Sequence, residues 1–222
     1  MDPTEYQIHR VEVAPGAIHI PGWVPVAYQR WIVSQCQDWA RAPSGLRATK
    51  LPWGGVMSVQ QVCLGWHWTP YQYGRVTDDG TPVKLLPEWL VRLGSRAVTE
   101  AYGVAAEEEY HPDVALINYY AGAAKLGMHQ DKDEQSAAPV VSLSLGDSCV
   151  FRLGNTENRH GPYTDVVLAS GDLFVFGGPS RMAYHGVPQM FPGSCEQDIG
   201  LEAGRFSITL RVTGMGAMRG RK

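Results

Sequence analysis

The chain has 222 residues, of which 44% are apolar and only 18% are charged, and its formal net charge is −3. A chain of this length buries about 70% of its unfolded surface, so it needs neither disulfides nor a metal to hold a core. Its 25 glycines and 15 prolines indicate many turns, but the composition excludes a disordered, collagen-like or coiled-coil protein. The sequence has no run of about 18 apolar residues, which excludes a membrane-spanning helix.

The cysteines indicate a reducing environment. The four of them lie far apart and form no CxxC pair, a pattern typical of reduced thiols in a cytoplasmic protein. The first residues also lack the basic-then-apolar pattern of a secretory signal, so we expect a cytoplasmic location and no membrane partner. Because the net charge is slightly negative, any contact with nucleic acid must come from a local basic patch.

Two helices are predicted in the first half of the chain. Residues 1–22 are expected to form an irregular lead-in. A helix is predicted over residues 24–40, where apolar and aromatic residues recur at helical spacing and Pro25 suits a first helical turn. A second helix is predicted over residues 87–102, with Gly103 at its C-terminal end.

From about residue 113 the pattern changes to short β-rich runs separated by glycine-containing turns. Many short strands with close turns predict a mainly β protein with flanking α-helices and a jelly-roll core. The predicted strands cover residues 113–120, 139–145, 149–153, 164–169, 172–176 and 205–213.

Three residues have the spacing of a metal site. His129 and Asp131 are two residues apart, so in extended chain both side chains point to one face. Such a pair is common on protein surfaces, but a second histidine, His185, follows later in the chain. Two neutral imidazoles and one carboxylate on one face of an octahedral metal leave three positions open, which is the arrangement of non-heme Fe(II) oxygenases.

The last predicted strand has a polar face. Arg205, Ser207 and Arg211 share one side of it, while apolar residues occupy the other. A solvated surface explains this pattern most simply. Alternatively, the polar face lines the mouth of a barrel, where a guanidinium can bind a dicarboxylate through paired hydrogen bonds. Asn118 and Tyr120, on one face of the 113–120 strand, could then hydrogen-bond a carboxylate held by Arg205.

The segment 116–134, with its HQDKDE motif, resembles the AlkB family of alkylated-nucleic-acid repair dioxygenases. The segment VSLSLG at residues 141–146, the sequence around His185 and the two arginines of the last strand are similar to that family as well. The resemblance covers roughly residues 50–213. It implies a double-stranded β-helix core, Fe(II) held by His129, Asp131 and His185, and 2-oxoglutarate and O₂ as co-substrates.

The resemblance also assigns the co-substrate residues. It implies that Asn118, Tyr120 and Arg205 hold the distal carboxylate of 2-oxoglutarate, with Arg211 near the metal-bound end. Ser207 stands where the family often has an asparagine, so one hydrogen bond to the co-substrate is expected to be weaker.

Four aromatic residues lie within the eight-residue stretch from Trp66 to Tyr73. A core hairpin would explain any single one, but the cluster favours a lid that offers stacking surfaces to a flipped base. By the resemblance, Trp66 would stack on the damaged base and Asp133 would contact its exocyclic amine. The expected substrate-contacting residues are Met57, Trp66, Tyr71, Tyr73, Asp133 and Arg159. The expected phosphate contacts are Arg75, Arg152, Arg159 with His160, Arg181, Arg219, Arg221 and Lys222.

Together these patterns predict one domain over residues 1–222. Within it we expect an N-terminal extension and helix (1–50), a nucleotide-recognition lid (51–85) and a catalytic jelly-roll core (113–213). The resemblance implies oxidative demethylation of N-alkylated bases, 1-methyladenine and 3-methylcytosine, in DNA that is preferably single-stranded. A monomer is expected.

Three other functions are compatible with parts of the pattern. An oxygenase of the same superfamily could act on RNA, tRNA or another substrate. A non-catalytic metal- or sugar-binding jelly roll would not need Arg205 and Arg211 in the barrel mouth. A hydrolytic zinc enzyme would have little use for a dicarboxylate clamp beside its metal.

Overall fold

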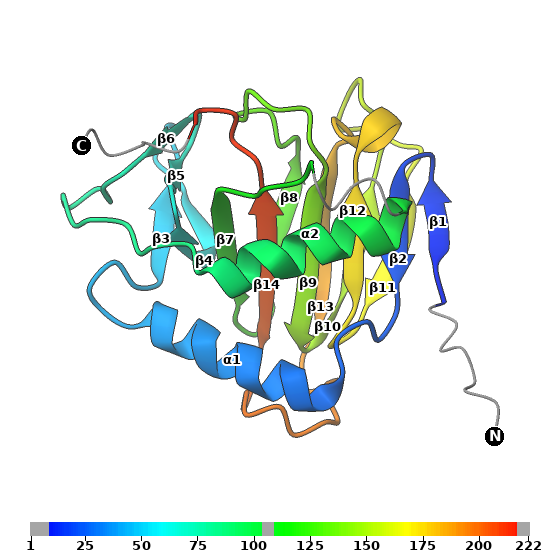
Figure 1. Ribbon diagram of the computed structural model, residues 1–222, viewed down its shortest axis with the longest axis horizontal. Coiled ribbons are helices and arrows are strands. Elements are labelled where there is room, and N and C mark those ends of the chain that lie inside the picture. Colours follow the sequence, from blue (N-terminus) through cyan, green and yellow to red (C-terminus); the bar gives the residue numbers. More distant parts are fainter. Residues whose placement is uncertain (1–8, 104–108, 217–222) are drawn as a thin grey trace.

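Two facing antiparallel sheets, with two α-helices outside the larger one, form the protein in this computed structural model, which describes residues 9–103 and 109–216 (Figure 1). The helices are α1 (Val26–Ala40), α2 (Glu88–Tyr102) and the short 3₁₀ helix η2 (Gly178–Ser180). The strands are β1 (Val11–Ala14), β2 (Ala17–Ile20), β3 (Arg47–Lys50), β4 (Val56–Leu64), β5 (His67–Thr69), β6 (Gln72–Gly74), β7 (Val114–Tyr120), β8 (Leu126–His129), β9 (Val140–Gly146), β10 (Ser148–Leu153), β11 (Thr164–Leu168), β12 (Leu173–Phe176), β13 (His185–Phe191) and β14 (Arg205–Arg211).

The order of the strands is that of a double-stranded β-helix. The larger sheet has eight strands in the order β1-β2-β12-β9-β14-β7-β4-β3, and the smaller has four in the order β11-β10-β13-β8. β5 and β6 form a separate hairpin. Because strands far apart in the chain lie side by side, such as β14 between β7 and β9, residues from several segments meet inside the barrel. The predicted mainly β fold with flanking helices is confirmed.

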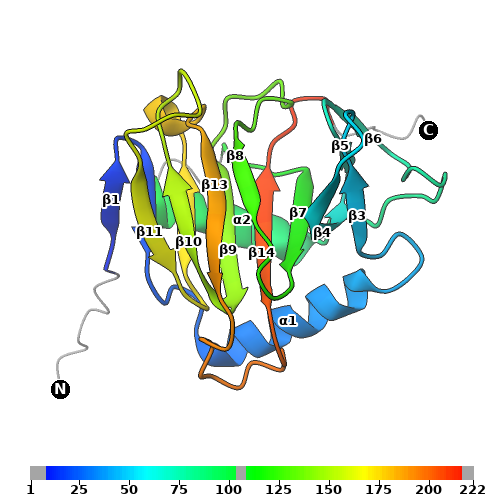
Figure 2. The same cartoon turned by 180° about the vertical axis from the view of Figure 1, so that it is seen from behind.

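The core has two layers. Figure 2 shows the smaller sheet on one side of the larger sheet and the helices on the other. One apolar cluster, which includes Ile32, Val98 and Ile208, packs the helices on the larger sheet. The second, which includes Phe151 and Phe174, fills the space between the two sheets. The larger sheet therefore has an apolar face under the helices and a face toward the barrel interior that can hold polar residues.

Strand β14 uses these two faces in alternation. Phe206, Ile208 and Leu210 belong to the cluster under the helices. Arg205 and Arg211 point to the opposite face and are also buried, at 1% and 7% exposure. The polar face of this strand therefore lines the interior of the barrel. A solvated surface, the simpler explanation of the sequence pattern, is wrong for this strand.

The helices lie where the sequence predicts them, with bounds shifted by one or two residues. α2 ends before Gly103, whose φ of 109° suits a glycine at this position. Gly94 lets α2 approach β14 closely, because a Cβ atom there would lie 2.8 Å from Leu210 Cδ1. α1 begins after Pro25, and α1 and α2 pack through Trp31, Trp39 and Trp89. None of the helices in the described ranges is long and apolar enough to cross a membrane.

The expected irregular lead-in is wrong for residues 11–20. These residues form the hairpin β1–β2, which adds two strands to the edge of the larger sheet beside β12. Its position is fixed by a buried pair, His19 Nε2 and Asp172 Oδ2, at 2.9 Å. The other oxygen of Asp172 accepts a hydrogen bond from the backbone N–H of Gly22. Four-residue strands give little sequence signal, and these two are held by contacts with a distant strand.

The segment expected to be a lid, residues 51–85, is divided in two. β4 is a nine-residue strand of the larger sheet, paired with β7 along its second half. The β5–β6 hairpin follows it and stands apart from both sheets, beside the C-terminal end of β14 (Figure 2). Both parts border the same cavity, the first through residues between Leu51 and Gln61 and the second through residues between Trp68 and Tyr71.

Candidate active site

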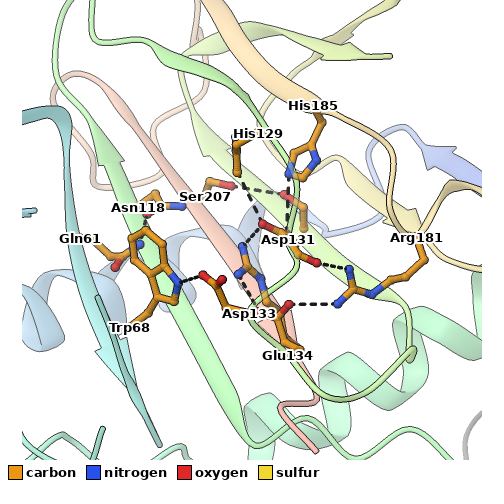
Figure 3. Close-up of polar contacts among 12 residues, drawn as sticks. Gln61, Trp68, Asn118, His129, Asp131, Asp133, Glu134, Arg181, His185 and Ser207 are labelled. Carbon is orange, nitrogen blue, oxygen red and sulfur yellow. Dashed lines mark hydrogen bonds and ion pairs between the residues drawn. The ribbon is translucent and has the colours of Figure 1, made fainter. Parts of the chain in front are cut away.

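His129, Asp131 and His185 come together at one mouth of the barrel. His129 ends β8, His185 begins β13, and the two are directly paired across these strands. One ligand atom from each of the three residues lies within 4.8 Å of the others. Asp131 Oδ1 lies 3.6 Å from Nε2 of His129, and Oδ2 lies 3.6 Å from Nε2 of His185. Figure 3 shows the three side chains converging.

Backbone carbonyls set the orientation of both imidazoles. Nδ1 of His129 lies 2.9 Å from the carbonyl oxygen of Gly127, and Nδ1 of His185 lies 3.0 Å from that of Ala183. A ring nitrogen this close to a carbonyl carries the proton and donates it. Nε2 of each ring therefore presents its lone pair toward Asp131, as a metal ligand requires.

The charges of the site suit a cation. Burial lowers the pKa of His185 to about 4, with a further contribution from His129, so this imidazole is neutral at pH 7. Burial alone would raise the pKa of Asp131, but Arg211 and the two histidines outweigh it and the pKa falls to about 2. Both groups are thus in the protonation states in which they bind metals.

The buried oxygen Asp131 Oδ2 has no hydrogen-bond partner among the described residues. A buried carboxylate oxygen is rarely left unpaired, because its desolvation is costly. His185 Nε2 faces this oxygen and His129 Nε2 faces the other oxygen of the same carboxylate, so the missing partner fits a divalent cation bound by two histidines and one carboxylate. His129, Asp131 and His185 therefore fit the Fe(II) ion that the sequence resemblance implies.

Arg205 lies deeper in the barrel and lacks a carboxylate partner in the described part of the chain. Its Nη2 donates to Ser144 Oγ at 2.9 Å, and its guanidinium lies 5.1 Å from the centre of the Tyr120 ring. Its Nε and Nη1 are buried and have no hydrogen-bond partner within residues 9–103 and 109–216. A buried cation is stable only when an anion compensates it, so this position fits one carboxylate of 2-oxoglutarate. Burial raises the pKa of Tyr120 to about 12, which keeps its hydroxyl protonated and able to donate.

The other co-substrate residues lie on neighbouring strands. Asn118 on β7 is directly paired with Ser207 on β14, and its Oδ1 accepts a hydrogen bond from Gln61 Nε2 at 2.9 Å. Ser207 Oγ lies 3.3 Å from Ser142 Oγ. Gln61, which the sequence pattern did not predict because it belongs to no motif, lines the same cavity as Asn118.

Arg211 lies at the far end of β14, beside the triad. Its Nη2 lies 2.8 Å from Asp131 Oδ1, and its Nη1 donates to Glu134 Oε1 at 2.9 Å. Its Nε is buried without a partner among the described residues. Arg205 and Arg211 therefore bracket the polar face of β14 with two donors that are not fully satisfied.

A cavity of about 490 Å³ opens beside the triad. Four of the expected substrate residues line it: Met57, Tyr71, Asp133 and Arg159. The cavity is also lined by three residues that the sequence pattern did not predict: Lys125, Lys132 and Trp53. The two lysines and Arg159 have no ion pair among the described residues, and Trp53 is 72% exposed.

The structure corrects the role expected of Trp66. The chain turns at Gly65, and Trp66 packs into a small cluster with Cys63 and Leu116, 9% exposed. Its Nε1 donates to Asp113 Oδ2 at 3.2 Å. It does not line the cavity. Trp68, two residues later, lines it instead and donates its Nε1 hydrogen to Asp133 Oδ2 at 2.8 Å (Figure 3).

Tyr73 also lies behind the cavity rather than in its wall. It is paired with Trp68 across the β5–β6 hairpin, and its hydroxyl donates to Glu134 Oε1 at 2.5 Å. Arg211 Nη1 lies 3.4 Å from the same hydroxyl. Of the two tyrosines expected to contact substrate, only Tyr71 lines the cavity.

Three of the arginines expected to contact phosphates have other partners. Arg75 lies over the Trp66 ring, with its guanidinium carbon 3.5 Å from the ring centre. Arg152 forms two hydrogen bonds of 2.7 Å to Asp165. Arg181 is buried and bound to Glu134 and to the Asp131 carbonyl. Arg219, Arg221 and Lys222 lie outside the described residues, and His160 is exposed but does not line the cavity.

Comparison with known proteins gives a family match over most of the chain. Residues 16–211 match the model of the 2OG-Fe(II) oxygenase superfamily. The Alpha-ketoglutarate-dependent dioxygenase AlkB homolog of Caulobacter vibrioides is 37% identical over 207 residues, which cover 90% of this chain and 88% of that protein. Alpha-ketoglutarate-dependent dioxygenase AlkB of Escherichia coli is 36% identical over 178 residues, which cover 77% of this chain and 79% of that protein.

Plant proteins are similar as well. The DNA N(6)-methyladenine demethylase ALKBH1D of Arabidopsis thaliana is 30% identical over 91% of this chain, and the chain spans half of that relative's length. A solved structure titled "The structure of OsALKBH1" superposes with a TM-score of 0.80 and 29% identity, covering 92% of this chain and all of the other.

Proposed function

The chain belongs to the 2OG-Fe(II) oxygenase superfamily, and on that basis we propose that it is a dioxygenase that demethylates N-alkylated bases in nucleic acid. The observation that carries the proposal is the pairing of a His-Asp-His triad with a buried arginine, Arg205, that has no carboxylate partner among the described residues. A metal-binding jelly roll without a co-substrate has no need of the second feature. A zinc hydrolase has no need of it either.

His129, Asp131 and His185 would hold Fe(II) through Nε2, a carboxylate oxygen and Nε2. Arg205 would bind the distal carboxylate of 2-oxoglutarate, with Asn118 and Tyr120 as its neighbours on β7. Arg211 would bind nearer the metal, and Ser207 lies between the two arginines on β14. When bound, iron, 2-oxoglutarate and O₂ supply the oxidation of the N-methyl group, with succinate, CO₂ and formaldehyde as by-products.

The residues around the cavity would select and position the base. Asp133 offers Oδ1, which has no hydrogen bond among the described residues, to the exocyclic amine of a base, while Trp68 holds Oδ2. A carboxylate here favours the ring cations of 1-methyladenine and 3-methylcytosine. Trp68 and Tyr71 offer aromatic faces for stacking, and Met57 adds an apolar contact.

Charge at the rim supports a polyanionic substrate despite the net charge of −3. Lys125, Lys132 and Arg159 surround the cavity, and the exposed indole of Trp53 stands beside them. Single-stranded nucleic acid combines the phosphates and the unstacked bases that these residues suit. We therefore propose alkylated single-stranded DNA as the substrate. We also propose that the enzyme acts as a monomer in the cytoplasm.

The plant relatives suggest a second substrate. These relatives are named as demethylases of N(6)-methyladenine in DNA, a base that carries no ring charge at neutral pH. A neutral base gains less from Asp133 than a cationic one, so the carboxylate favours 1-methyladenine. Comparison of the two substrates separates these functions.

The experiment is mass spectrometry of short oligonucleotides, each with one modified base, incubated with protein, Fe(II), ascorbate and 2-oxoglutarate. The modified bases are 1-methyladenine, 3-methylcytosine and N(6)-methyladenine in DNA, and 1-methyladenine in RNA. Loss of one CH₂ unit that requires both iron and 2-oxoglutarate supports demethylation and ranks the substrates. Succinate formation without any loss of mass would reject the base substrates but keep the oxygenase. Absence of both products would reject the proposal.

A further inference from the structure

The β5–β6 hairpin is joined to the metal site through two adjacent carboxylates. Trp68 and Tyr73 face each other across the hairpin. Trp68 donates to Asp133, and Tyr73 donates to the next residue, Glu134, at 2.8 and 2.5 Å. Both carboxylates follow Asp131 within three residues, so the hairpin that borders the substrate cavity is attached to the segment that carries a metal ligand.

Glu134 is the centre of this connection. Its side chain is fully buried, at 0% exposure, although it carries a charge. Its Oε1 accepts hydrogen bonds from both Tyr73 and Arg211, and its Oε2 accepts one from Arg181 at 3.1 Å. Three donors on one buried carboxylate give it a single position, and that position depends on where the hairpin holds Tyr73.

Arg211 is the residue that Glu134 positions. Its guanidinium is shared between Glu134 on Nη1 and Asp131 on Nη2, which leaves Nε buried and unpaired among the described residues. The planar guanidinium presents its donors in a fixed pattern, so the bond to Glu134 decides which edge faces the co-substrate. Without that bond, Arg211 can rotate and place two donors on Asp131, where the metal should bind.

We propose that Tyr73 and Glu134 are positioning residues that connect the hairpin beside the substrate cavity to Arg211, so that nucleic acid and 2-oxoglutarate each strengthen the binding of the other. The proposal rests on the function proposed above, because it needs both ligands to bind at this site. A substrate that contacts Trp68 and Asp133 orders the hairpin and, through Tyr73, the guanidinium. Thermodynamic linkage then requires 2-oxoglutarate to tighten nucleic-acid binding by the same factor by which nucleic acid tightens 2-oxoglutarate binding.

A purely structural role for these bonds has different consequences. If Tyr73 only stabilised the hairpin, its loss would lower the melting temperature and leave the two ligands independent. If it couples the sites, its loss changes the ratio of 2-oxoglutarate affinities with and without nucleic acid. The loss of one hydrogen bond to a charged group corresponds to about a five- to ten-fold effect on that ratio.

The test measures binding rather than turnover. Isothermal titration calorimetry under argon, on the full chain loaded with Mn(II), gives the Kd of 2-oxoglutarate with and without a saturating single-stranded oligonucleotide containing 1-methyladenine. The variants are Tyr73→Phe, Glu134→Gln and the double variant. The control is Tyr102→Phe, which removes a hydroxyl bonded to the Gly16 carbonyl oxygen at the opposite edge of the protein.

We expect the oligonucleotide to tighten 2-oxoglutarate binding about five-fold in the wild type and in Tyr102→Phe. In Tyr73→Phe the ratio should approach one, and the double variant should lose no more coupling than Glu134→Gln alone. A ratio of one in the wild type with both ligands bound, or an unchanged ratio in Tyr73→Phe, would overturn the coupling and leave the proposed function intact. Failure of the wild type to bind the oligonucleotide at all would instead overturn the proposed function, and the coupling with it.

Discussion

Trp68 Nε1 donates a hydrogen bond of 2.8 Å to Asp133 Oδ2, and the other carboxylate oxygen, Oδ1, has no hydrogen bond in the described part of the chain. This contact makes Trp68, rather than Trp66, the tryptophan of the substrate cavity. We predict that Trp68→Phe raises the KM for a 1-methyladenine oligonucleotide about ten-fold, because Asp133 loses the donor that orients it. The KM for 2-oxoglutarate should stay within about two-fold of the wild-type value, since the phenyl ring leaves the Tyr73–Glu134–Arg211 contacts in place.

Trp66→Phe is the matched control for this substitution. It removes the hydrogen bond to Asp113 and part of the packing under Arg75, so the melting temperature should fall while the KM for the oligonucleotide stays unchanged. Steady-state formaldehyde release and a thermal melt on both variants measure the two effects. The opposite result, a raised KM in Trp66→Phe alone, would restore the assignment expected from the sequence.

The sequence contains the parts of the site that depend on short spacing. The alternation along 205–211 places Arg205 and Arg211 on one face, and the HQD triplet places His129 and Asp131 together. Both features follow from the geometry of extended chain, which needs no knowledge of distant contacts. The pairing of His185 with His129 needs the resemblance, because nothing in the local sequence brings β13 beside β8.

The parts that the sequence did not predict depend on turns and on distant partners. Trp66 and Trp68 have the same chemistry, and their different positions go with the bend at Gly65 and with the distant carboxylates that hold them, Asp113 and Asp133. In the sequence, Arg152 and Arg181 have no neighbouring acidic residue and are predicted to be available to phosphates. In the structure, they pair with Asp165 and Glu134, which lie far from them in the chain. Residue type gives charge, but availability for a ligand depends on contacts made far along the chain.

The metal assignment predicts that His129→Ala loses iron binding and demethylation together. The His129 side chain is about one-third exposed at the edge of the cavity, so its removal should leave the melting temperature of the metal-free protein almost unchanged. Turnover should fall at least 100-fold, because two ligands cannot hold the ion in an open three-ligand geometry. Metal content by atomic absorption and formaldehyde release measure both effects, with the exposed His111→Ala as the control. Substantial turnover in His129→Ala would remove this residue from the metal site.

For Arg205, the expectation concerns stabilisation by the co-substrate. Replacing the buried guanidinium by methionine removes an uncompensated charge, so the melting temperature without ligand should not fall. The 2-oxoglutarate-induced rise in melting temperature should disappear, because the affinity falls about 100-fold or more. Thermal melts of the Mn(II)-loaded protein against 2-oxoglutarate concentration measure the shift. Arg152→Met, which removes an exposed ion pair, should retain it; an undiminished shift in Arg205→Met would place the distal carboxylate elsewhere.

Arg159 and Arg152 differ in whether their charge is available to a phosphate. Arg159 lines the cavity without an ion pair among the described residues, whereas Arg152 is held by Asp165. We predict that Arg159→Ala weakens oligonucleotide binding and reduces the slope of log Kd against log salt by about one, the signature of one lost phosphate contact. Fluorescence anisotropy at several salt concentrations measures the slope. Equal slopes in Arg159→Ala and wild type would remove this arginine from the interface.

The buried carboxylate of Glu134 predicts a specific acid sensitivity. Burial alone would raise its pKa, but Arg211 and the Tyr73 hydroxyl outweigh that effect and the pKa is lowered. A carboxyl group with a lowered folded-state pKa stabilises the fold above its unfolded-state pKa of about 4.3, and this stabilisation is lost as the pH falls through the folded-state value. The melting temperature of Glu134→Gln should therefore lie below that of the wild type at pH 6, and the difference should shrink as the pH falls below about 4. Circular dichroism melts of the metal-free protein between about pH 3 and pH 7 measure the difference.

In the exposed control Asp165→Asn the difference in melting temperature from the wild type should be small at every pH, because the Arg152–Asp165 pair is open to solvent. A pH-independent difference in Glu134→Gln would mean that this residue acts through shape rather than charge, and that Arg211 does not depend on its ionisation.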